Sequence, residues 1–380
     1  SGTYDANGNF DATSGTIDFT GSGTLKIGAT VTSTTTSLGT LDAAAGTVWY
    51  DGGPLTIISD DYYSLKISQP NTKTAAGTVN VNGDLTLSTG ATYSIGATTT
   101  TVTGTSDLDG TLAVSTGLYD ANGTFDATNG TIDFSGAGTL KLGSTVTSLG
   151  TLDDATGTVE YDQSSGFSAS ILADSYNNLT SNIGSGVSFN TTAGSITTNG
   201  QFKINSGSKT VLLGGTLTSG SMDIDGELSC LNFDVTCSGT SDIDGTLTIA
   251  GHTFDANGTF DATNGNVTFT GAGTLELGGT VTSLGTFTGG GNSTVVYDGG
   301  AQIIDDFSSK SGPYDNLTIT GSDDKDLSGN TTVSDLLSWT ADIDLEANGH
   351  TLTITQTPSG YNDSRLIVGG SSNIVSVAYS

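Results

Sequence analysis

Tyr119–Leu152 reads YDANGTFDATNGTIDFSGAGTLKLGSTVTSLGTL, and the chain contains this stretch three times. The copy at Phe254–Phe287 is identical to it at 26 of the 34 positions. The copy that begins at Tyr4 carries four extra residues near Ser33–Thr36. Such self-similarity is typical of a chain that uses one structural unit repeatedly. We therefore expect three imperfect long repeats in one continuous structure, the second of them the longest: residues 1–117, 118–252 and 253–380.

Apolar residues alternate with polar ones within each repeat. Period two places both members of an apolar pair on one face of a β-strand, with Thr, Ser, Asp or Lys on the other face. Gly and Asn, which favour turns, separate successive pairs by roughly six to ten residues. Apolar runs with helical spacing are absent, so the chain is predicted to be all-β. Clear pairs are Ile17/Phe19, Leu25/Ile27, Val48/Tyr50, Leu65/Ile67 and Leu85/Leu87.

Two all-β architectures agree with this pattern: an elongated parallel β-solenoid, or β-helix, and three tandem β-sandwich domains. The strand spacing is short for a sandwich, in which strands recur every ~8–12 residues. The chain also lacks the linkers expected between separate domains. Its high content of Thr, Ser and Asn suits side-chain ladders on stacked strands. We therefore predict the β-solenoid and keep the tandem sandwiches as the alternative.

The chain is strongly acidic, with 39 acidic residues against 9 basic ones and a formal net charge of −30. Nucleic-acid binding needs clusters of Lys and Arg that neutralise phosphate, so we expect no nucleic-acid partner. Binding to anionic lipid is disfavoured for the same reason. No run of 18 apolar residues occurs, so we expect no transmembrane helix and no membrane insertion.

Two cysteines, Cys230 and Cys237, lie seven residues apart in the segment GELSCLNFDVTCSG. The chain has no other cysteine and no histidine close to them in sequence, which excludes a four-ligand zinc site. Two interpretations stay open. The pair could form a disulfide, which would fit an oxidising compartment, or it could consist of two buried thiols.

An Asp-x-Asn-Gly turn with a second Asp opens each repeat. Oxygen ligands at the first, third and seventh positions, beside a glycine turn, are the kind of group that binds Ca²⁺. The alternative is an Asx turn, in which the side chains bond nearby backbone N–H groups. The candidate calcium ligands are Asp5, Asn7 and Asp11, then Asp120, Asn122 and Asp126, then Asp255, Asn257 and Asp261.

The acidic motifs do not favour an enzyme, because an active site is normally unique and these motifs recur. His252 and His350 have no neighbouring Ser or Cys in a nucleophile motif. Glycoside hydrolysis needs only two well-placed carboxylates, so a polysaccharide-active β-helix enzyme is a third-ranked interpretation. We predict no catalytic residues and no enzymatic activity.

The C-terminal stretch Arg365–Ser380 reads RLIVGGSSNIVSVAYS and is apolar and almost uncharged. A terminal strand of this kind needs a partner, which the N-terminal repeat of another copy could supply. A head-to-tail contact of this kind propagates as a filament. In the alternative, the strand folds back into its own core. The candidate assembly residues are Ile374, Val375, Val377 and Tyr379.

The segments Phe125–Leu140, FDATNGTIDFSGAGTL, and Tyr314–Ser322, YDNLTITGS, resemble the repetitive β-solenoid modules of bacterial and archaeal surface proteins, both adhesin-like and autotransporter-passenger-like. The resemblance implies an extracellular or cell-surface structural role and supplies no catalytic residues. We expect a secreted protein that self-assembles head-to-tail into a filament or surface layer. The alternative is an adhesin stalk that binds glycan or a partner cell, which should carry a distinct tip domain.

Overall fold

The computed structural model describes residues 2–8, 10–28, 38–42, 44–153, 155–163, 170–183, 188–306, 312–339, 343–355, 366–367 and 375–377. No residue in these ranges lies in a helix, and parallel strands stack as a β-solenoid of about 16 turns. The predicted β-solenoid is confirmed. Tandem β-sandwiches, the alternative, would require antiparallel sheets. The chain divides into two compact units, Ser1–Val187 (unit 1) and Ser188–Ser380 (unit 2), which we describe separately.

Unit 1 contains three main parallel sheets. The first sheet holds β1 (Thr3–Ala6), β3 (Thr24–Ile27), β5 (Thr47–Tyr50), β8 (Ser64–Ile67), β11 (Leu85–Leu87), β14 (Ser106–Leu108), β17 (Phe125–Asp126) and β20 (Val146–Ser148). The second holds β6 (Leu55–Ile57), β9 (Asn71–Ala75), β12 (Ala91–Ser94), β15 (Thr111–Ala113), β18 (Thr131–Asp133) and β21 (Thr151–Asp153). The third holds β7 (Asp61–Tyr62), β10 (Val79–Val81), β13 (Thr99–Val102), β16 (Leu118–Ala121), β19 (Thr139–Leu142), β22 (Thr158–Tyr161), β24 (Ser175–Tyr176) and β25 (Asn178–Ser181). The remaining strands of unit 1 are β2 (Thr16–Ile17), which pairs with β4 (Thr40–Leu41), and β23 (Ser170–Ile171).

Unit 2 is built in the same way from four sets of parallel strands. The first set is β26 (Ser188–Thr191), β28 (Lys209–Val211), β30 (Glu227–Cys230), β33 (Thr246–Ile249), β36 (Asn266–Phe269) and β39 (Thr286–Thr288). The second is β27 (Ile196–Ile204), β29 (Leu217–Ile224), β31 (Val235–Cys237), β32 (Ser241–Ile243), β34 (Thr253–Ala256), β35 (Phe260–Asp261), β37 (Thr274–Leu277), β38 (Val281–Ser283), β40 (Thr294–Tyr297), β42 (Asn316–Ile319) and β45 (Leu337–Trp339). The third is β41 (Gln302–Ile304), β43 (Lys325–Leu327), β46 (Leu345–Glu346) and β48 (Leu366–Ile367). The fourth is β44 (Thr331–Val333), β47 (Leu352–Ile354) and β49 (Val375–Val377).

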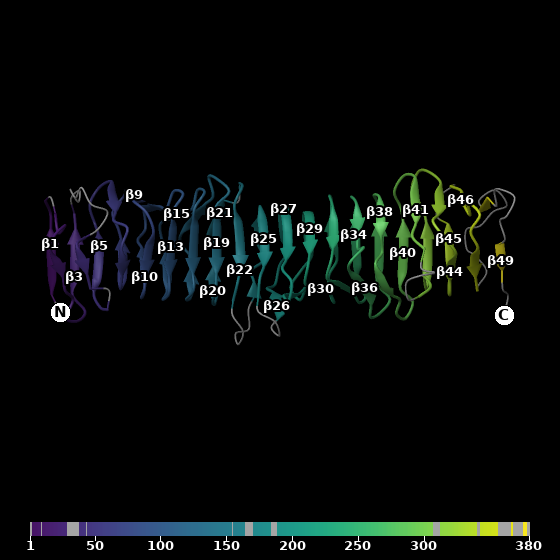
Figure 1. The fold of residues 1–380 in the computed structure, drawn as a ribbon, viewed down its shortest axis with the longest axis horizontal. Helices are drawn as coiled ribbons and strands as arrows, with labels where there is room; N and C mark the ends of the chain where they lie inside the picture. The colour runs from purple at the N-terminus through teal and green to yellow at the C-terminus, as the bar shows by residue number, and fades with distance from the viewer. Residues whose placement is uncertain are drawn as a thin grey trace. The chain divides into compact units, whose positions relative to one another are not determined.

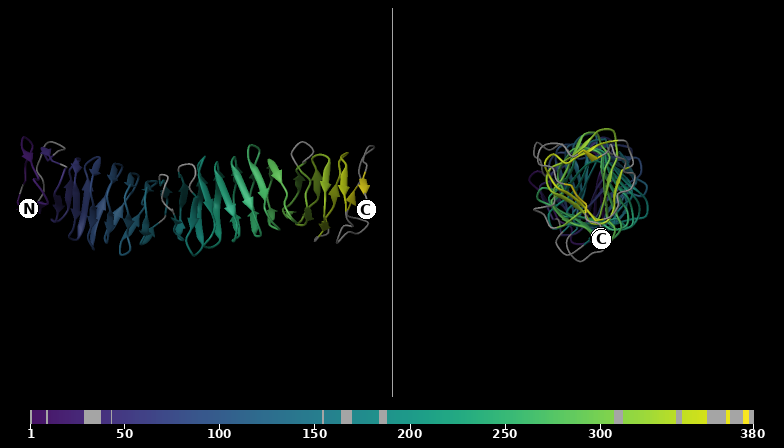
Figure 2. Two further views of the ribbon diagram at one scale, coloured as in Figure 1. Left: turned by 90° about the horizontal axis from the view of Figure 1, so that it is seen from below. Right: turned by 90° about the vertical axis from the view of Figure 1, so that its right-hand side faces the viewer.

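Each turn is three-sided. In unit 1, for example, one turn runs through β11, β12 and β13, which belong to three different sheets. Side chains alternate along every short strand, and the apolar ones point into the coil, so that Leu85 and Leu87 are fully buried as the alternation predicted. Figure 1 labels some of the strands of each unit, and Figure 2 shows the last turns of unit 2 end-on, as loops around a common interior.

The three copies of the repeated stretch adopt the same register. In each copy four strands on successive turns place equivalent apolar residues directly above one another. The stacked residues are Tyr4, Leu25, Val48 and Leu65 in the first copy, Tyr119, Leu140, Val159 and Leu179 in the second, and Phe254, Leu275, Val295 and Leu317 in the third. The sequence repeats are therefore structural repeats.

A buried pair of tyrosines closes one corner of every repeat. The hydroxyl oxygens of Tyr50 and Tyr62 lie 3.1 Å apart, and the Tyr62 hydroxyl donates to the carbonyl of Ile58 at 2.7 Å. The Ile58 amide donates in turn to the Tyr50 oxygen at 3.2 Å. Buried hydroxyls need such partners because an unpaired one costs about 1–3 kcal/mol. The equivalent pairs are Tyr161/Tyr176, 3.3 Å apart, and Tyr297/Tyr314, 3.0 Å apart.

Candidate functional site at the open N-terminal end

The first turn of unit 1 exposes residues that the other two copies bury. Tyr4 is 65 % exposed, whereas Tyr119 and Phe254, which occupy the same register position, are 0 % exposed. Phe10, Ile17 and Phe19 are half-buried, whereas their counterparts are at most 3 % exposed: Phe125 and Phe260, Ile132 and Val267, Phe134 and Phe269. Equivalent side chains are therefore exposed or half-buried in the first copy and buried in the other two.

A preceding strand covers the other two copies. β13 pairs with β16, and the amide of Asn122 donates to the carbonyl of Val102 at 2.8 Å. β31 pairs with β34, and the amide of Asn257 donates to the carbonyl of Cys237 at 2.8 Å. In the first copy the equivalent amide, that of Asn7, has no acceptor among the described residues. Figure 1 shows β1 as the outermost strand at this end of unit 1.

A hollow of about 590 Å³, lined by apolar and polar side chains, opens at the same end. Its lining includes one carboxylate, that of Asp18, and no His, Cys, Lys or Arg. The hollow therefore suits apolar contact better than acid–base or nucleophilic chemistry. An exposed edge strand beside it can accept a further parallel strand through its free N–H and C=O groups. The aromatic and branched aliphatic lining residues are Tyr4, Phe10, Ile17, Phe19 and Leu25.

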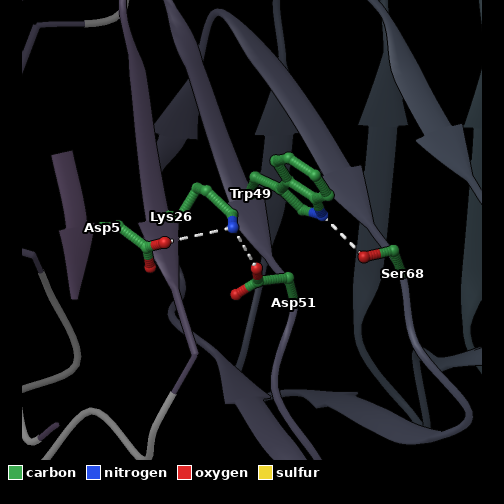
Figure 3. Close-up of polar contacts among 5 residues, drawn as sticks. All are labelled: Asp5, Lys26, Trp49, Asp51 and Ser68. Atoms are coloured by element: carbon green, nitrogen blue, oxygen red, sulfur yellow. Dashed lines mark hydrogen bonds and ion pairs between the residues drawn. The ribbon is translucent and has the colours of Figure 1, made fainter. Parts of the chain in front are cut away.

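A charged column runs along the outer face of the first turns (Figure 3). The ammonium of Lys26 lies 3.2 Å from Asp5 and 2.7 Å from Asp51. It also lies 4.7 Å from the centre of the Trp49 ring, and the ammonium of Lys66 lies 4.5 Å from it. The hydrogen bond with Asp51, and then that with Asp5, raises the pKa of Lys26. The column thus ties β1 to β3 and β5 by opposite charges and by cation–π contacts.

The charged column changes its composition between the repeats. In the second copy Lys141 lies 3.2 Å from Glu160 and 3.6 Å from Asp162. In the third copy the lysine is replaced by Glu276, which pairs in register with Asp255 and Val296. Burial, and then the charges of Asp255 and Asp298, raise the pKa of the Glu276 carboxyl. The third copy therefore carries a like-charge cluster where the others carry ion pairs.

Glu276→Lys is expected to stabilise unit 2 by about 1 kcal/mol at low salt, because it replaces repulsion by an ion pair of the kind that Lys26 and Lys141 make. Urea unfolding at neutral pH measures the gain, which should shrink as salt screens the charges. Glu276→Gln, which removes the repulsion alone, should give a smaller gain. A loss of stability in the lysine variant would contradict this account.

The sign of the wild-type pH dependence follows from the raised pKa of Glu276. A carboxyl whose pKa is higher in the folded than in the unfolded state penalises folding when it is ionised. Glu276 should therefore stabilise unit 2 progressively as the pH falls from neutrality through its folded pKa. Above that pKa the penalty is fully present.

The predicted calcium ligands are divided between two local roles. Asp5 forms the ion pair with Lys26. The Asp11 carboxylate accepts hydrogen bonds from the amide and the hydroxyl of Thr13, at 2.9 and 2.6 Å, and these bonds lower its pKa. Asp126 and Asp261 cap Thr128 and Thr263 at the same distances, so the Asx turn is present in all three copies.

Within the described ranges, no group of three or more Asp, Glu, His or Cys side chains is placed to hold a metal ion. Asn122 and Asn257 instead follow the first strands of their repeats, and their amides bond to the preceding turn. Calcium binding at the Asp-x-Asn-Gly turns stays a prediction. The third candidate ligand in each copy, Asp11, Asp126 or Asp261, accepts hydrogen bonds from a nearby threonine and needs no metal ion for them.

The two cysteines are free and buried. Cys230 lies on β30 and Cys237 on β31, strands that belong to different sheets. The Cys237 thiol donates to the carbonyls of Gly239 and Thr240, at 3.6 and 3.5 Å. Burial raises the pKa of both thiols. The structure thus has the second of the two arrangements that the sequence left open, two buried thiols and no disulfide.

Two of the four candidate assembly residues lie in the described part of the C-terminal stretch. Val375 and Val377 belong to β49, which pairs in parallel with β47 of the same chain. Val375 is opposite Leu352, and Val377 is opposite Ile354. Ile374 and Tyr379 lie outside the described residues.

Sequence reasoning did not identify which side chains the open first turn exposes. The residues that make it, Tyr4, Phe10, Ile17 and Phe19, are the same types that the repeats bury elsewhere. Residue type therefore carries no signal of exposure at this site.

No helix within the described ranges is long and apolar enough to cross a membrane. Comparisons with protein-family models, with curated proteins and with solved structures find no match to this chain.

Proposed function

We propose that this chain is a secreted structural protein whose copies associate head-to-tail into an extracellular filament or surface layer. The observation that carries the proposal is the open first turn. Tyr4 is 65 % exposed there, and its two counterparts are fully buried by a preceding strand. An uncovered strand edge beside a hollow that aromatic side chains line is a template for a further parallel strand.

The geometry of the contact favours a filament over a closed dimer. The open end of β1 would meet a different surface of the next copy, so the contact is heterologous and repeats along a line. The net charge of −30 opposes close approach of two copies. Because salt screens such repulsion, association should strengthen as the ionic strength rises.

Tyr4→Asp is expected to weaken association about 100-fold while leaving the fold of unit 1 intact. Tyr4 is mostly exposed in the single chain, so a charge there costs the free protein little. In the assembled state the same charge would occupy a position that is fully buried at Tyr119 and Phe254, where an unpaired carboxylate costs several kcal/mol.

Sedimentation and negative-stain electron microscopy over a range of protein and salt concentrations measure the effect. The matched control is Tyr63→Asp, which changes another exposed tyrosine of unit 1, 43 % exposed. This variant should associate like the wild type. The proposal fails if the wild-type chain stays monomeric throughout, or if Tyr4→Asp assembles as readily as the control.

A further inference from the structure

We infer that copies of this chain also dock side by side, with an outward column of side chains in unit 1 of one copy lying antiparallel on an outward column in unit 2 of another. A column here is the set of outward side chains that lie in register on successive turns. This inference rests on the proposed association of copies and adds a lateral contact to it. The two columns are the tryptophan column of unit 1 and the glutamate column of unit 2.

The strand register defines both columns. Successive members of a column lie one strand spacing apart, ~4.8 Å, so the two columns have the same period. In chain order, the tryptophan column is Asp5, Lys26, Trp49, Lys66, Thr86 and Asp107. In the same order, the glutamate column is Thr236, Asp255, Glu276, Val296, Thr318 and Ser338.

The tryptophan column contains an ammonium that no carboxylate neutralises. The ammonium of Lys66 lies 4.5 Å from the centre of the half-buried Trp49 ring, and among the described residues it forms no ion pair. The other lysines that the structure places on an outer face each form an ion pair with a carboxylate: Lys26, Lys141, Lys203 and Lys209. In a chain with a net charge of −30, an unpaired ammonium is a place where a carboxylate of another copy can bind.

The glutamate column shows the complementary deficiency. Glu276 lies in register between Asp255 and Val296, and no lysine or histidine of the described ranges forms an ion pair with Glu276. Burial, and then the charges of Asp255 and Asp298, raise the pKa of the Glu276 carboxyl. Val296 points outward and is half-buried. The column therefore offers a carboxylate that lacks a cation, with an apolar side chain one turn away.

The charges decide the direction of the contact. With Trp49 opposite Val296, the antiparallel arrangement places Lys66 opposite Glu276. The remaining opposed residues are then Asp5 with Ser338, Lys26 with Thr318, Thr86 with Asp255, and Asp107 with Thr236. No like charges meet. The parallel arrangement places Asp5 opposite Asp255, and like charges directly opposite each other are unfavourable.

Two other acidic columns lack one of these features. In the second copy Lys141 already forms an ion pair with Glu160, so this column neutralises its own lysine. A further column of unit 2 offers no outward apolar side chain to Trp49 among its stacked residues, which are Lys203, Asp223, Asp242 and Asp261.

A third column, that of Ile303, Asp326 and Glu346, also places an apolar residue beside a carboxylate. Asp326 accepts a hydrogen bond from the side-chain amide of Asn348 at 2.6 Å. No hydrogen bond contributes to the raised pKa of Glu276, so its carboxyl has the greater need of an ammonium. We therefore place Lys66 opposite Glu276.

A single contact of this kind is weak, because exposed ion pairs contribute little to binding. Copies that are already joined end to end repeat the contact along the whole filament, and repetition multiplies its effect. The lateral contact therefore accounts for the step from a filament to a layer.

Cross-linking of two mixed single-cysteine chains tests the contact. One chain carries Thr86→Cys and the other Thr236→Cys, which lies one turn from Asp255, the residue opposite Thr86. A short bifunctional maleimide that spans the ~10 Å between packed sheets should join them. Thr86→Cys mixed with Ser338→Cys should give no product, because only the parallel arrangement brings these positions together. The native cysteines, Cys230 and Cys237, are 0 % exposed.

Charge reversal then identifies the ion pair. Lys66→Glu in the Thr86→Cys chain, or Glu276→Lys in the Thr236→Cys chain, should lower the yield at least about tenfold, because like charges then meet. The two reversed chains mixed together should recover the yield, since the pair is restored with opposite polarity. Lys209→Glu, which changes the net charge equally at a site away from both columns, is the matched control and should leave the yield unchanged. Circular dichroism confirms that each variant is folded.

Each mixture is examined with Tyr4 and with Tyr4→Asp, which separates the lateral contact from the end-to-end one. A product with Ser338→Cys in place of Thr236→Cys would overturn the antiparallel arrangement. A yield that falls with Lys66→Glu but does not recover with Glu276→Lys would overturn the assigned ion pair. The absence of any product from chains that still associate end to end would overturn the lateral contact and leave the proposed function standing.

Discussion

Above pH 10, unit 1 is expected to unfold before unit 2. The described residues include eight fully buried tyrosines, six of them in unit 1 and two in unit 2. Burial raises the pKa of every one of them, to about 12 for Tyr50 and for Tyr161. The set consists of Tyr50, Tyr62, Tyr93, Tyr119, Tyr161 and Tyr176 in unit 1, and Tyr297 and Tyr314 in unit 2.

The direction of this pH dependence of stability follows from proton linkage. A tyrosine in the unfolded chain loses its proton near pH 10, whereas the buried tyrosine keeps it to a higher pH. The contribution to stability is complete below pH 10 and is lost as the pH rises from there toward the folded pKa. Each buried tyrosine removes about 1.4 kcal/mol per pH unit in that interval. Unit 1 should lose about 8 kcal/mol per pH unit and unit 2 about 3.

One tryptophan in each unit provides the measurement. Trp49 belongs to β5 in unit 1, and Trp339 belongs to β45 in unit 2. Fluorescence of the single-tryptophan variants Trp339→Phe and Trp49→Phe therefore reports the alkaline transition of each unit, while phenolate absorbance follows ionisation. We expect the transition at Trp49 at the lower pH, with phenolate appearing together with unfolding.

Two results would contradict this account. Phenolate from the buried tyrosines could appear near pH 10 while the circular dichroism is unchanged, which would show that these hydroxyls are accessible in the folded state. Alternatively, both tryptophans could report a transition at the same pH. As a control, substituting the exposed Tyr63 by Phe should leave both transitions where they are.

The strands and their inward faces could be predicted from the sequence, because period-two alternation is a local property. Leu65/Ile67 and Leu85/Leu87 were assigned to the core from spacing alone, and all four are at most 1 % exposed. The parallel solenoid was likewise predictable, because the copies of one stretch imply one unit stacked on itself.

The contacts between turns could not be predicted in the same way. Tyr50 and Tyr62 are 12 residues apart, but the equivalent pairs are separated by 15 and 17 residues. The length of the intervening loop varies, so sequence spacing does not reveal which tyrosines meet. The exposure of Tyr4 escaped prediction because the burial of a side chain in a coil depends on what lies on the neighbouring turn.

Contacts between turns also decide which glycines the fold needs. Gly258→Ala should destabilise unit 2 by about 3 kcal/mol. A Cβ atom at this position would lie 2.2 Å from the carbonyl oxygen of Gly239 on the preceding turn and 2.4 Å from its carbonyl carbon. Both are backbone atoms held by the coil, so relief requires the turns to separate locally, and overpacking of this kind typically costs 1–3 kcal/mol or more.

This glycine belongs to a column that follows one corner of unit 2. A Cβ at Gly239 would lie 2.5 Å from the carbonyl oxygen of Gly220, and a Cβ at Gly279 would lie 2.2 Å from that of Gly258. Each glycine in the column thus leaves room for the carbonyl of the one before it. The column explains part of the high glycine content, since a stacked corner of this type admits no side chain.

The matched control is Gly251→Ala. No atom lies within 4 Å of a Cβ built on Gly251, which belongs to the same unit and lies seven residues earlier. Urea unfolding followed through Trp339 should show a clear fall in stability for Gly258→Ala and a change of at most a few tenths of a kcal/mol for Gly251→Ala. Equal effects would mean that the turns are not in close contact at this corner. A loss confined to Gly258 would show that the register between turns, and not glycine content as such, makes the residue necessary.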